Sequence, residues 1–319
     1  MAKLIGIDVG GTNLRLGVID YTVGNPNQAP LLIEEMRFQA DFSTLCKSHQ
    51  HSPAQAWQLI LTTIASAISK VREKHPEVSA VGVGFPGFID PNTQKIAQSP
   101  NLPNLSQVDL TADLSRLIQL PVITENDALA AAYGEYVIGT THTKNLIYLG
   151  LGTGVGGGLV MHGQPFPGQH GVAMEVGHII VKPHGRLCGC GNHGCMEQYA
   201  SASGVSLSYF EATSQHCSAE EVANRAYEGD QDAVAAYALA GATLAQALAH
   251  ILKVIDVTDV LIGGGMSVAW PLMVQFFQQQ LDSDLIPVLR GKINVNISRM
   301  GDQAGIIGAA MLAQQKGLV

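Results

Sequence analysis

The chain opens with two apolar runs separated by a pair of glycines. Residues 4–20 read LIGIDVGGTNLRLGVID, with Gly10–Gly11 at the centre and the polar Arg15 inside the second run. Short apolar runs on either side of a glycine turn are typical of two strands joined by a tight connection. We therefore expect strand, glycine turn and strand in this segment.

A similar pattern returns near the middle of the chain. Residues 147–161 read IYLGLGTGVGGGLVM and align with residues 5–19, so that Gly152 corresponds to Gly10. Two such segments, one opening each half of the chain, indicate a duplicated architecture.

Helical periodicity fills the sequence between these segments. In residues 56–71 the apolar side chains fall at positions 57, 60, 64, 68 and 71, which is the spacing of one helix face. Further strands are expected at 78–85, 121–124 and 259–265, and further helices at 128–138, 233–256 and 304–315. Strands that alternate with helices predict an α/β protein with mixed sheets.

The length of 319 residues favours two domains over one core. A boundary near Leu120–Pro121 gives a smaller N-terminal domain of residues 1–120 and a larger domain of residues 121–302. We expect the terminal helix, residues 303–319, to return and pack on the first domain.

Composition and charge narrow the possible functions. Apolar residues make up 46% of the chain, charged residues 14%, and the net charge is −8. Without a run of Lys and Arg, this charge argues against a nucleic-acid surface. The sequence reaches Asp8 without a signal segment and shows no uninterrupted apolar stretch of membrane-spanning length. We expect a soluble cytoplasmic protein that does not bind membranes.

Glycines cluster directly after three of the expected strands. The clusters are Gly10–Gly11, the glycines of residues 152–158, and Gly263–Gly265. Such turns let backbone N–H groups approach an anion, and Asp8 could hold a hydrated Mg²⁺ beside phosphate groups. For any one cluster, a plain hairpin turn is an equal alternative.

Two well-known nucleotide motifs do not account for these glycines. Residues 152–157 fit G-x-G-x-x-G, but a strand and a loop follow them where a dinucleotide site needs a helix. The Gly-Lys-Ser/Thr ending of a phosphate-binding P-loop is missing from the sequence. We therefore reject a dinucleotide-dependent dehydrogenase.

Three polar residues, Glu125, Asn126 and Asp127, lie between an expected strand and an expected helix. Asn or Asp at this place commonly caps the helix. Alternatively, Asp127 could accept a proton from a hydroxyl group that attacks a γ-phosphate. The two roles are compatible if Asn126 is the cap.

The segment 184–198, HGRLCGCGNHGCMEQ, is a candidate metal site. Cys188, Cys190 and Cys195 have C-x-C-x₄-C spacing, and Zn²⁺ favours a closed set such as three cysteines and one histidine. Their spacing leaves His178, His184 and His193 open as the fourth ligand. A reduced thiol cluster without metal is the alternative, and a redox relay is disfavoured because no C-x-x-C occurs. Cys46 and Cys217 stand alone, and no role is assigned to them.

Taken together, the motifs resemble those of ROK-family sugar kinases. DVGGTN, GFPGFID, SPNL, ENDA, LGTGVGGG, EVGH and CGCGNHGCMEQ occur in the family's order and span nearly the whole chain. The resemblance implies an actin-like ATPase or hexokinase-type fold of two α/β domains with mixed sheets and a cleft between them. It also implies ATP-dependent phosphorylation of the 6-hydroxyl of a hexose, with Mg²⁺ accompanying ATP and a structural Zn²⁺.

The resemblance also implies roles for individual residues. It makes Asp127 the catalytic base. The sugar contacts that it implies are Gly87, Asn101, Asn126, Asp127, Glu175, His178 and Glu197. The nucleotide and phosphate contacts that it implies are Asp8, Gly10, Gly11, Thr12, Asn13, Gly152, Thr153, Gly154, Gly264 and Gly265. The zinc ligands that it implies are His178, Cys188, Cys190 and Cys195.

The sugar is the open point of this interpretation. The segments 184–201 and 125–136 are most similar to those of glucokinases, which favours glucose, with N-acetylglucosamine or N-acetylmannosamine as the alternatives. The family also includes sugar-responsive transcriptional regulators, which place a DNA-binding domain ahead of the kinase-like region. We expect no such domain here because the first glycine turn follows residue 8. A homodimer or homotetramer is implied by the family alone.

Overall fold

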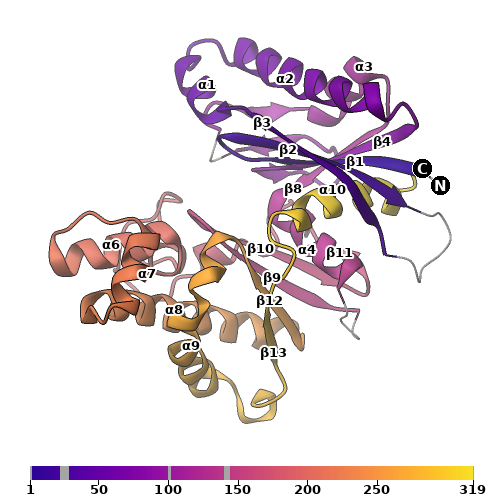
Figure 1. Cartoon of the computed structure of the whole chain (residues 1–319). Helices are drawn as coiled ribbons and strands as arrows, with labels where there is room; N and C mark the ends of the chain where they lie inside the picture. The colour runs from indigo at the N-terminus through magenta and orange to yellow at the C-terminus, as the bar shows by residue number, and fades with distance from the viewer. Residues whose placement is uncertain (1, 22–28, 100–101, 140–143, 319) are drawn as a thin grey trace. The chain divides into compact units, whose positions relative to one another are not determined.

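The structure is a computed structural model that describes residues 2–21, 29–99, 102–139 and 144–318 (Figure 1). The chain forms two compact units, and neither is continuous in sequence. The first unit comprises residues 1–144, 158–173 and 302–319, and the second comprises residues 145–157 and 174–301.

The first unit is built on a five-stranded mixed sheet in the order β3-β2-β1-β4-β8. Its strands are β1 (Ala2–Val9), β2 (Asn13–Tyr21), β3 (Leu31–Gln39), β4 (Val78–Phe85) and β8 (Val122–Asn126). β1 and β2 are antiparallel, with Asp8 opposite Arg15, whereas β4 and β8 continue the sheet in parallel. The expected strand, glycine turn and strand over residues 4–20 are confirmed.

One face of this sheet is covered by helices, as Figure 1 shows. They are α1 (Phe42–Ser48), α2 (Pro53–Lys74) and α3 (Leu110–Ile118). The side chains at positions 57, 60, 64, 68 and 71 of α2 are all buried, so the helical spacing read from the sequence is the buried face. Each large apolar side chain buried this way stabilises the fold by roughly 1.5–3 kcal/mol. A small sheet of β5 (Phe88–Ile89), β6 (Ile96–Gln98) and β7 (Ser106–Val108) follows β4.

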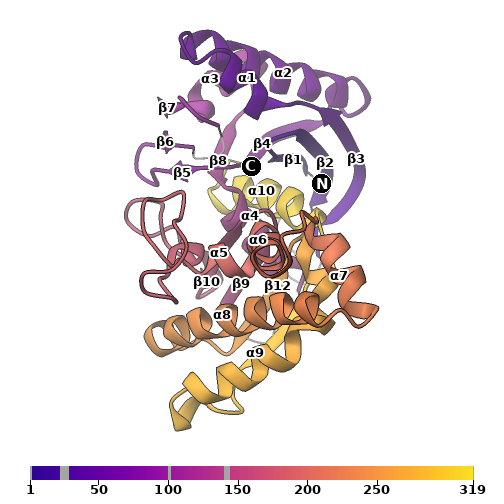
Figure 2. The same cartoon turned by 90° about the vertical axis from the view of Figure 1, so that its left-hand side faces the viewer.

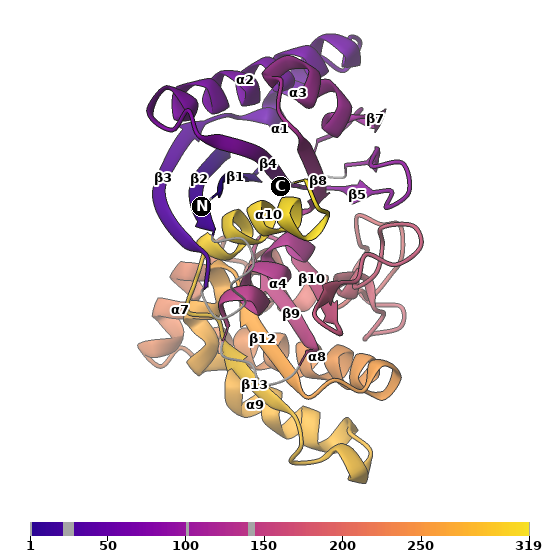
Figure 3. The ribbon, with the colours of Figure 1, turned by 90° about the vertical axis from the view of Figure 1, so that its right-hand side faces the viewer.

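The other face of the sheet is packed against α10 (Gln303–Gln315), and α10 in turn packs against α4 (Asp127–Ile138) (Figure 3). The approach is close because glycines replace side chains at the contacts. A Cβ on Gly82 of β4 would collide with the carbonyl group of Ala309, and one on Gly308 would collide with that of Ala130. These backbone-to-backbone contacts require glycine at both positions.

The second sheet has five strands in the order β11-β10-β9-β12-β13 and is also mixed. Its strands are β9 (Leu146–Leu151), β10 (Val155–Met161), β11 (Gln164–Pro165), β12 (Asp259–Gly263) and β13 (Asn294–Ile297). β9, β12 and β13 run parallel, and β10 and β11 are antiparallel. The strands β9 and β10 flank a glycine turn just as β1 and β2 do, as the sequence similarity predicts. The predicted α/β fold with mixed sheets is confirmed.

Helices of the second unit pack around α8 (Gln231–Ile255), which lies alongside α9 (Trp270–Asp284) in Figure 2. α5 (Glu197–Ala200), α6 (Ala202–Thr213) and α7 (Ala219–Tyr227) also contact α8. The short 3₁₀ turns of this unit are η1 (Val176–His178), η2 (Gly265–Ala269) and η3 (Pro287–Leu289).

By length and composition α8 could cross a membrane, although Gln246, His250 and Lys253 interrupt its apolar residues. Residues such as Leu244, Leu248 and Leu252 are fully buried against neighbouring helices. Packing inside the unit therefore explains why this helix is so apolar.

Candidate active site and metal centre

The first glycine turn joins β1 to β2 and is closed by main-chain hydrogen bonds. The N–H of Gly10 donates to the carbonyl of Asn13 at 2.8 Å, and the carbonyl of Gly11 accepts from Ser43 N–H at 3.2 Å. Thr12 and Asn13 are exposed at the tip. A Cβ on Gly11 would meet no atom, so the space beside this turn is open to a ligand.

Asp8 is the penultimate residue of β1, just before this turn. Burial raises the pKa of Asp8 to about 6, the Arg15 guanidinium opposes the rise, and Asp302 adds to it. Arg15 lies opposite Asp8 in the sheet and forms an ion pair with Asp302, with Nη1 and Oδ2 2.5 Å apart. A carboxylate beside an open glycine turn fits the expected Mg²⁺ role because Mg²⁺ binds carboxylate and phosphate oxygens.

Asn126 is the N-cap of α4, as one interpretation of the sequence predicted. Its side-chain oxygen accepts from Leu129 N–H at 3.0 Å. Its amide nitrogen donates to the carbonyl of Gly87 at 3.1 Å and so fixes the loop after β4. A Cβ on Gly87 would lie 2.7 Å from the carbonyl oxygen of Gln98, which accounts for a glycine there.

Asp127 is the first residue of α4 and is partly exposed. Its Oδ1 accepts from Ala128 N–H at 2.8 Å, which orients the carboxylate at the helix N-terminus. The partial positive charge at that end of a helix stabilises an ionised carboxylate. The cap on Asn126 and the carboxylate of Asp127 therefore coexist, as the sequence allowed.

Glu125 precedes this pair and is only 6% exposed. Burial raises the pKa of Glu125 to about 7, while its hydrogen bond from Asn126 N–H and the charge of Lys316 oppose the rise. No role was assigned to Glu125 from the sequence. Its position at the end of the apolar strand β8 was the available signal.

The second glycine turn, Gly152–Gly154, lies in the second unit. Gly152 N–H donates to the carbonyl of Gly154 at 2.9 Å, and Gly152 accepts from Ala202 N–H at 2.9 Å. Val155 N–H, directly after the turn, donates to Oε2 of Glu197 at 2.9 Å. Thr153 is exposed at the tip.

Glu175, His178 and Glu197, the expected sugar contacts of this unit, lie near one another. Oε2 of Glu175 is 3.8 Å from Nε2 of His178. Burial raises the pKa of Glu175, the neighbouring Glu197 raises it further, and His178 opposes the rise. All three side chains are partly exposed, so a ligand can reach them.

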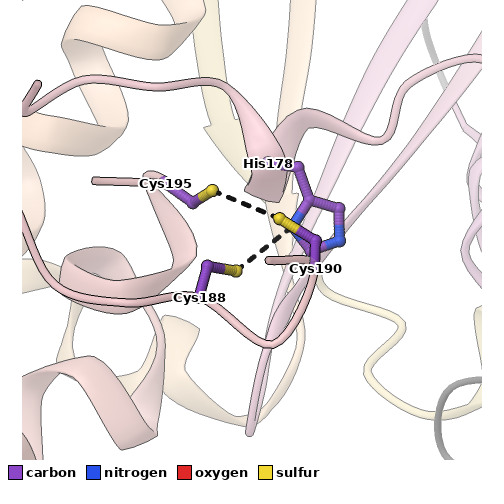
Figure 4. Close-up of side chains that lie close together, drawn as sticks. All are labelled: His178, Cys188, Cys190 and Cys195. Carbon is purple, nitrogen blue, oxygen red and sulfur yellow. Dashed lines mark hydrogen bonds between the residues drawn. The ribbon is translucent and has the colours of Figure 1, made fainter. Parts of the chain in front are cut away.

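Four side chains converge on a candidate metal centre, as Figure 4 shows. They are His178, Cys188, Cys190 and Cys195, whose ligand atoms all lie within 4.8 Å of one another. Cys188 Sγ is 3.6 Å from His178 Nδ1, and Cys190 Sγ is 3.6 Å from Cys195 Sγ. A tetrahedral zinc site with ordinary bond lengths separates its ligand atoms by about 3.5–3.8 Å, so the set fits Zn²⁺.

The structure decides which histidine joins the cysteines. His178 faces them through Nδ1, which leaves Nε2 directed to Glu175. His193 instead pairs through Nδ1 with the carbonyl of Gly185 at 3.1 Å, and His184 is exposed. The family resemblance had selected His178, which sequence spacing could not do.

The loop that carries the cysteines is held by Arg186 and Tyr199, which sequence reasoning missed. Arg186 lies over the Tyr199 ring, with its guanidinium carbon 4.7 Å from the ring centre. Its Nη2 donates to Glu211 Oε2 at 2.6 Å and to Ser208 Oγ at 2.9 Å on α6. The only sequence signal was an arginine followed by an aromatic residue beyond the cysteines.

The third glycine cluster follows β12. Gly264 has a φ of 81°, and a Cβ there would collide with the backbone of Leu151, so glycine is required. Gly265 begins η2, and a Cβ there would meet no atom. Asn101, an expected sugar contact, lies outside the described residues.

The predicted residues thus fall into two local groups. The first unit brings together Asp8, the turn at residues 10–13, Gly87, Asn126 and Asp127. The second unit brings together the turn at residues 152–154, Glu175, Glu197 and the four candidate metal ligands, with Gly264 and Gly265 after β12.

Comparison with known proteins decides the family. The model of the ROK family matches residues 32–316. The chain belongs to the ROK family. A glucokinase of Thermotoga maritima is 31% identical to this ROK protein over 98% of each chain. An N-acetyl-D-glucosamine kinase of Shigella flexneri is 30% identical over 96% of this chain and 98% of its own length.

A solved structure agrees with these relatives. A ROK family glucokinase from Streptomyces griseus, in complex with glucose and AMPPNP, has a TM-score of 0.80 and 29% identity. The similarity covers 98% of this chain and all of the other. The chain is therefore a sugar kinase of the ROK family, with the actin-like, hexokinase-type fold.

Proposed function

We propose that this ROK kinase is a glucokinase, which transfers the γ-phosphoryl group of ATP to the 6-hydroxyl of glucose. The observation that carries the proposal is the end-to-end similarity to glucokinases, including one solved with glucose and AMPPNP. The local geometry around Asp127 supports it.

Asp127 is the proposed general base. As O6 of the sugar attacks the γ-phosphorus, its proton passes to the Asp127 carboxylate, an O6–P bond forms, and the bond from phosphorus to the bridging oxygen of ADP breaks. The hydrogen bond from Ala128 N–H holds this carboxylate at the start of α4. Such a base typically contributes 10²–10⁴-fold to the rate.

The glycine turns supply charge stabilisation. Main-chain N–H groups of residues 10–13 and 152–154 would bind phosphate oxygens, with Gly264 and Gly265 toward the adenosine. Mg²⁺, held near Asp8, would neutralise the β- and γ-phosphate oxygens when bound.

Asn126, Glu175, His178 and Glu197 would contact hydroxyl groups of the sugar. Gly87 and Asn101 are further proposed sugar contacts. Zn²⁺, held by His178, Cys188, Cys190 and Cys195, would orient His178 and Glu197 without taking part in the reaction.

N-acetylglucosamine is the second candidate substrate, because its kinases are as much as 30% identical over nearly the whole chain. N-acetylmannosamine is a third alternative. The discrimination depends on the space around C2 of the sugar, where the acetamido group needs more room than a hydroxyl.

A panel of hexoses in a coupled assay of ADP release tests the substrate. We expect kcat/KM for glucose to exceed that for either N-acetyl sugar by at least about tenfold, which corresponds to about 1.4 kcal/mol of transition-state discrimination. Preference for an N-acetyl sugar would assign the second or third candidate instead.

We also propose that the enzyme works in the cytoplasm as a homodimer or homotetramer. The net charge of −8 fits a protein that does not bind nucleic acids, in line with a kinase rather than a transcriptional regulator. Light scattering of the purified protein measures the oligomeric state, and a monomer would contradict the proposal.

A further inference from the structure

Glu197 joins the candidate metal centre to the second glycine turn. It begins α5 two residues after Cys195, and its Oε2 accepts from Val155 N–H at 2.9 Å. Val155 is the residue that follows the turn Gly152–Gly154 and is itself 7% exposed. A hydrogen bond to a charged acceptor at a part-buried place is stronger than one between neutral groups.

The glycine at position 154 makes room for this carboxylate. A Cβ on Gly154 would collide with Oε2 of Glu197 and lie 3.2 Å from its Cδ. By contrast, a Cβ on Gly152 would meet no atom within 4 Å. The two glycines of this turn therefore differ in their surroundings. Only at position 154 would a side chain displace the carboxylate of Glu197.

A second contact holds the other end of the turn. The carbonyl of Gly152 accepts from Ala202 N–H, the first N–H group of α6, at 2.9 Å. Both ends of the turn are thus bonded to residues 197–202, which follow the last cysteine of the metal centre directly. The turn also closes on itself through Gly152 N–H and Gly154 O, and the two outside contacts tie it to residues 197–202.

We propose that Glu197 is a positioning residue for the nucleotide, which holds the Gly152–Gly154 turn through Oε2 while Oε1 serves the sugar. The inference rests on the proposed function, in which this turn binds phosphate. One carboxylate then couples the two substrates, so that a sugar bound to Glu197 orders the turn and strengthens nucleotide binding. The metal centre acts on the nucleotide through the same carboxylate, because Cys195 fixes the start of α5.

The first test compares Glu197→Ala with Glu197→Gln, which keeps an oxygen acceptor. Without sugar, we expect E197A to weaken binding of Mg²⁺·AMPPNP by at least about fivefold, because the bond to Val155 N–H is lost, and E197Q to stay within about threefold of wild type. In steady state, E197A should raise KM for ATP as well as for glucose. A residue that contacts only the sugar would raise KM for glucose alone, and that result would overturn the proposal.

Hydrogen exchange of the Val155 amide tests the contact without any measurement of activity. The amide should be protected in wild type and E197Q and should exchange faster in E197A. Wild-type protein stripped of metal by a chelator should behave as E197A does. Unchanged protection in E197A would overturn the role of Glu197, and unchanged protection after stripping would overturn the link to the metal centre.

Gly154→Ala and Gly152→Ala form a matched pair in which neither Glu197 nor any metal ligand is substituted. Each adds one methyl group to the same turn, but only G154A displaces the carboxylate. We expect G154A to speed exchange at Val155 and to weaken glucose binding by about fivefold. G152A, which alters the same turn without touching Glu197, should leave exchange at Val155 as in wild type. Equal exchange at Val155 in the two variants would overturn the inference, even if E197A failed to fold.

The same experiments separate this inference from the function on which it rests. If wild-type protein did not bind Mg²⁺·AMPPNP or phosphorylate any sugar, the proposed function would fail. If it did both, and E197A bound nucleotide within about twofold of wild type with Val155 still protected, only the inference would fail.

Discussion

At the scale of single residues, two adjacent carboxyl groups have opposite characters. Asp127 is partly exposed at a helix N-terminus, whereas Glu125 is enclosed by protein, which raises its pKa. The backbone N–H of Asn126 and the side chain of Asn126 lie between them and bond to Glu125 and Gly87. A short polar sequence thus places a partly exposed carboxyl group, the proposed base, two residues after a buried one.

We predict that Asp127→Ala lowers kcat by about 10²–10⁴-fold while glucose binding stays measurable, because a base is needed in the reaction more than in binding. Steady-state kinetics and calorimetry measure the two quantities. Asp109→Ala is the matched control, since Asp109 also accepts a backbone N–H at the start of a helix, α3. A near-normal kcat in D127A would remove Asp127 from the role of base.

Glu125 makes stability depend on pH in a predictable direction. Its pKa rises from 4.5 to about 7 on folding, so the folded state binds the proton more tightly than the unfolded state. The resulting stabilisation is present below pH 4.5 and is lost as the pH rises through 7, by roughly 3 kcal/mol in total.

We predict that Glu125→Gln removes this loss. The difference in unfolding free energy between E125Q and wild type should shift in favour of the variant by roughly 3 kcal/mol between about pH 4 and about pH 8. Urea unfolding at a series of pH values measures it. Glu73→Gln, at an exposed position on α2, should show no such shift, and parallel profiles for E125Q and wild type would contradict the assignment.

At the scale of elements, the loop around the cysteines combines two kinds of support. Isolated bridges pair Ile180 with Cys195 and Leu187 with His193, and Arg186 fastens the loop to α6. Main-chain hydrogen bonds also cross the loop, such as those from Val181 N–H to Gly194 and from Gly194 N–H to Arg186. A bound metal would add a link between His178 of η1 and the three cysteines.

We predict that the purified protein contains one zinc per chain and that a chelator inactivates it by disordering residues 175–198. Metal analysis and limited proteolysis measure the two effects. Cys195→Ser should lose the metal, whereas Cys217→Ser, outside the cluster, should keep both metal and activity. Active protein that contains no zinc would refute the assignment.

Sequence patterns predicted the structure best where it depends on residues that are close together in the chain. The glycine turns, the buried face of α2 and the cap at Asn126 follow from local spacing and local chemistry, and the structure has them where expected. The choice of His178 over His184 and His193 could not follow from spacing. It depends on how η1 approaches the loop, which is a tertiary property.

Contacts between segments far apart in the chain could not be predicted from the sequence for the same reason. Nothing in the sequence pairs Glu197 with Val155, or Arg186 with Glu211, because each pair joins segments whose register is set by packing. The apolar composition of α8 likewise has two possible causes, and only the neighbours of that helix distinguish a core helix from a membrane span.

At the scale of the whole molecule, the chain crosses between its two units after residues 144, 157, 173 and 301. The first unit therefore contains the earliest strands and one of the last helices. Ile306, Ile307, Met311 and Leu312 of α10 are buried, and their burial stabilises the fold by on the order of 6–12 kcal/mol. This is comparable to the whole stability of an ordinary domain.

We predict that removal of residues 302–319 prevents the first unit from folding. The deletion should abolish cooperative thermal unfolding and yield protein that binds a dye for exposed apolar surface. Removal of residues 317–319 alone is the control and should leave unfolding near that of wild type, because these residues follow α10. A folded, cooperative product of the longer deletion would contradict the importance of α10.

The close packing of α10 on the sheet at Gly82 has a consequence for biosynthesis. β1 and β4 emerge from the ribosome while residues 303–315 are still untranslated, so the sheet face around Gly82 has no helix to cover it during most of translation. The usual order, in which the N-terminal domain folds first as it is made, is then unavailable to this chain. The apolar face of the sheet therefore stays uncovered until residues 303–315 have been synthesised. We expect chaperones to bind the nascent chain during that time.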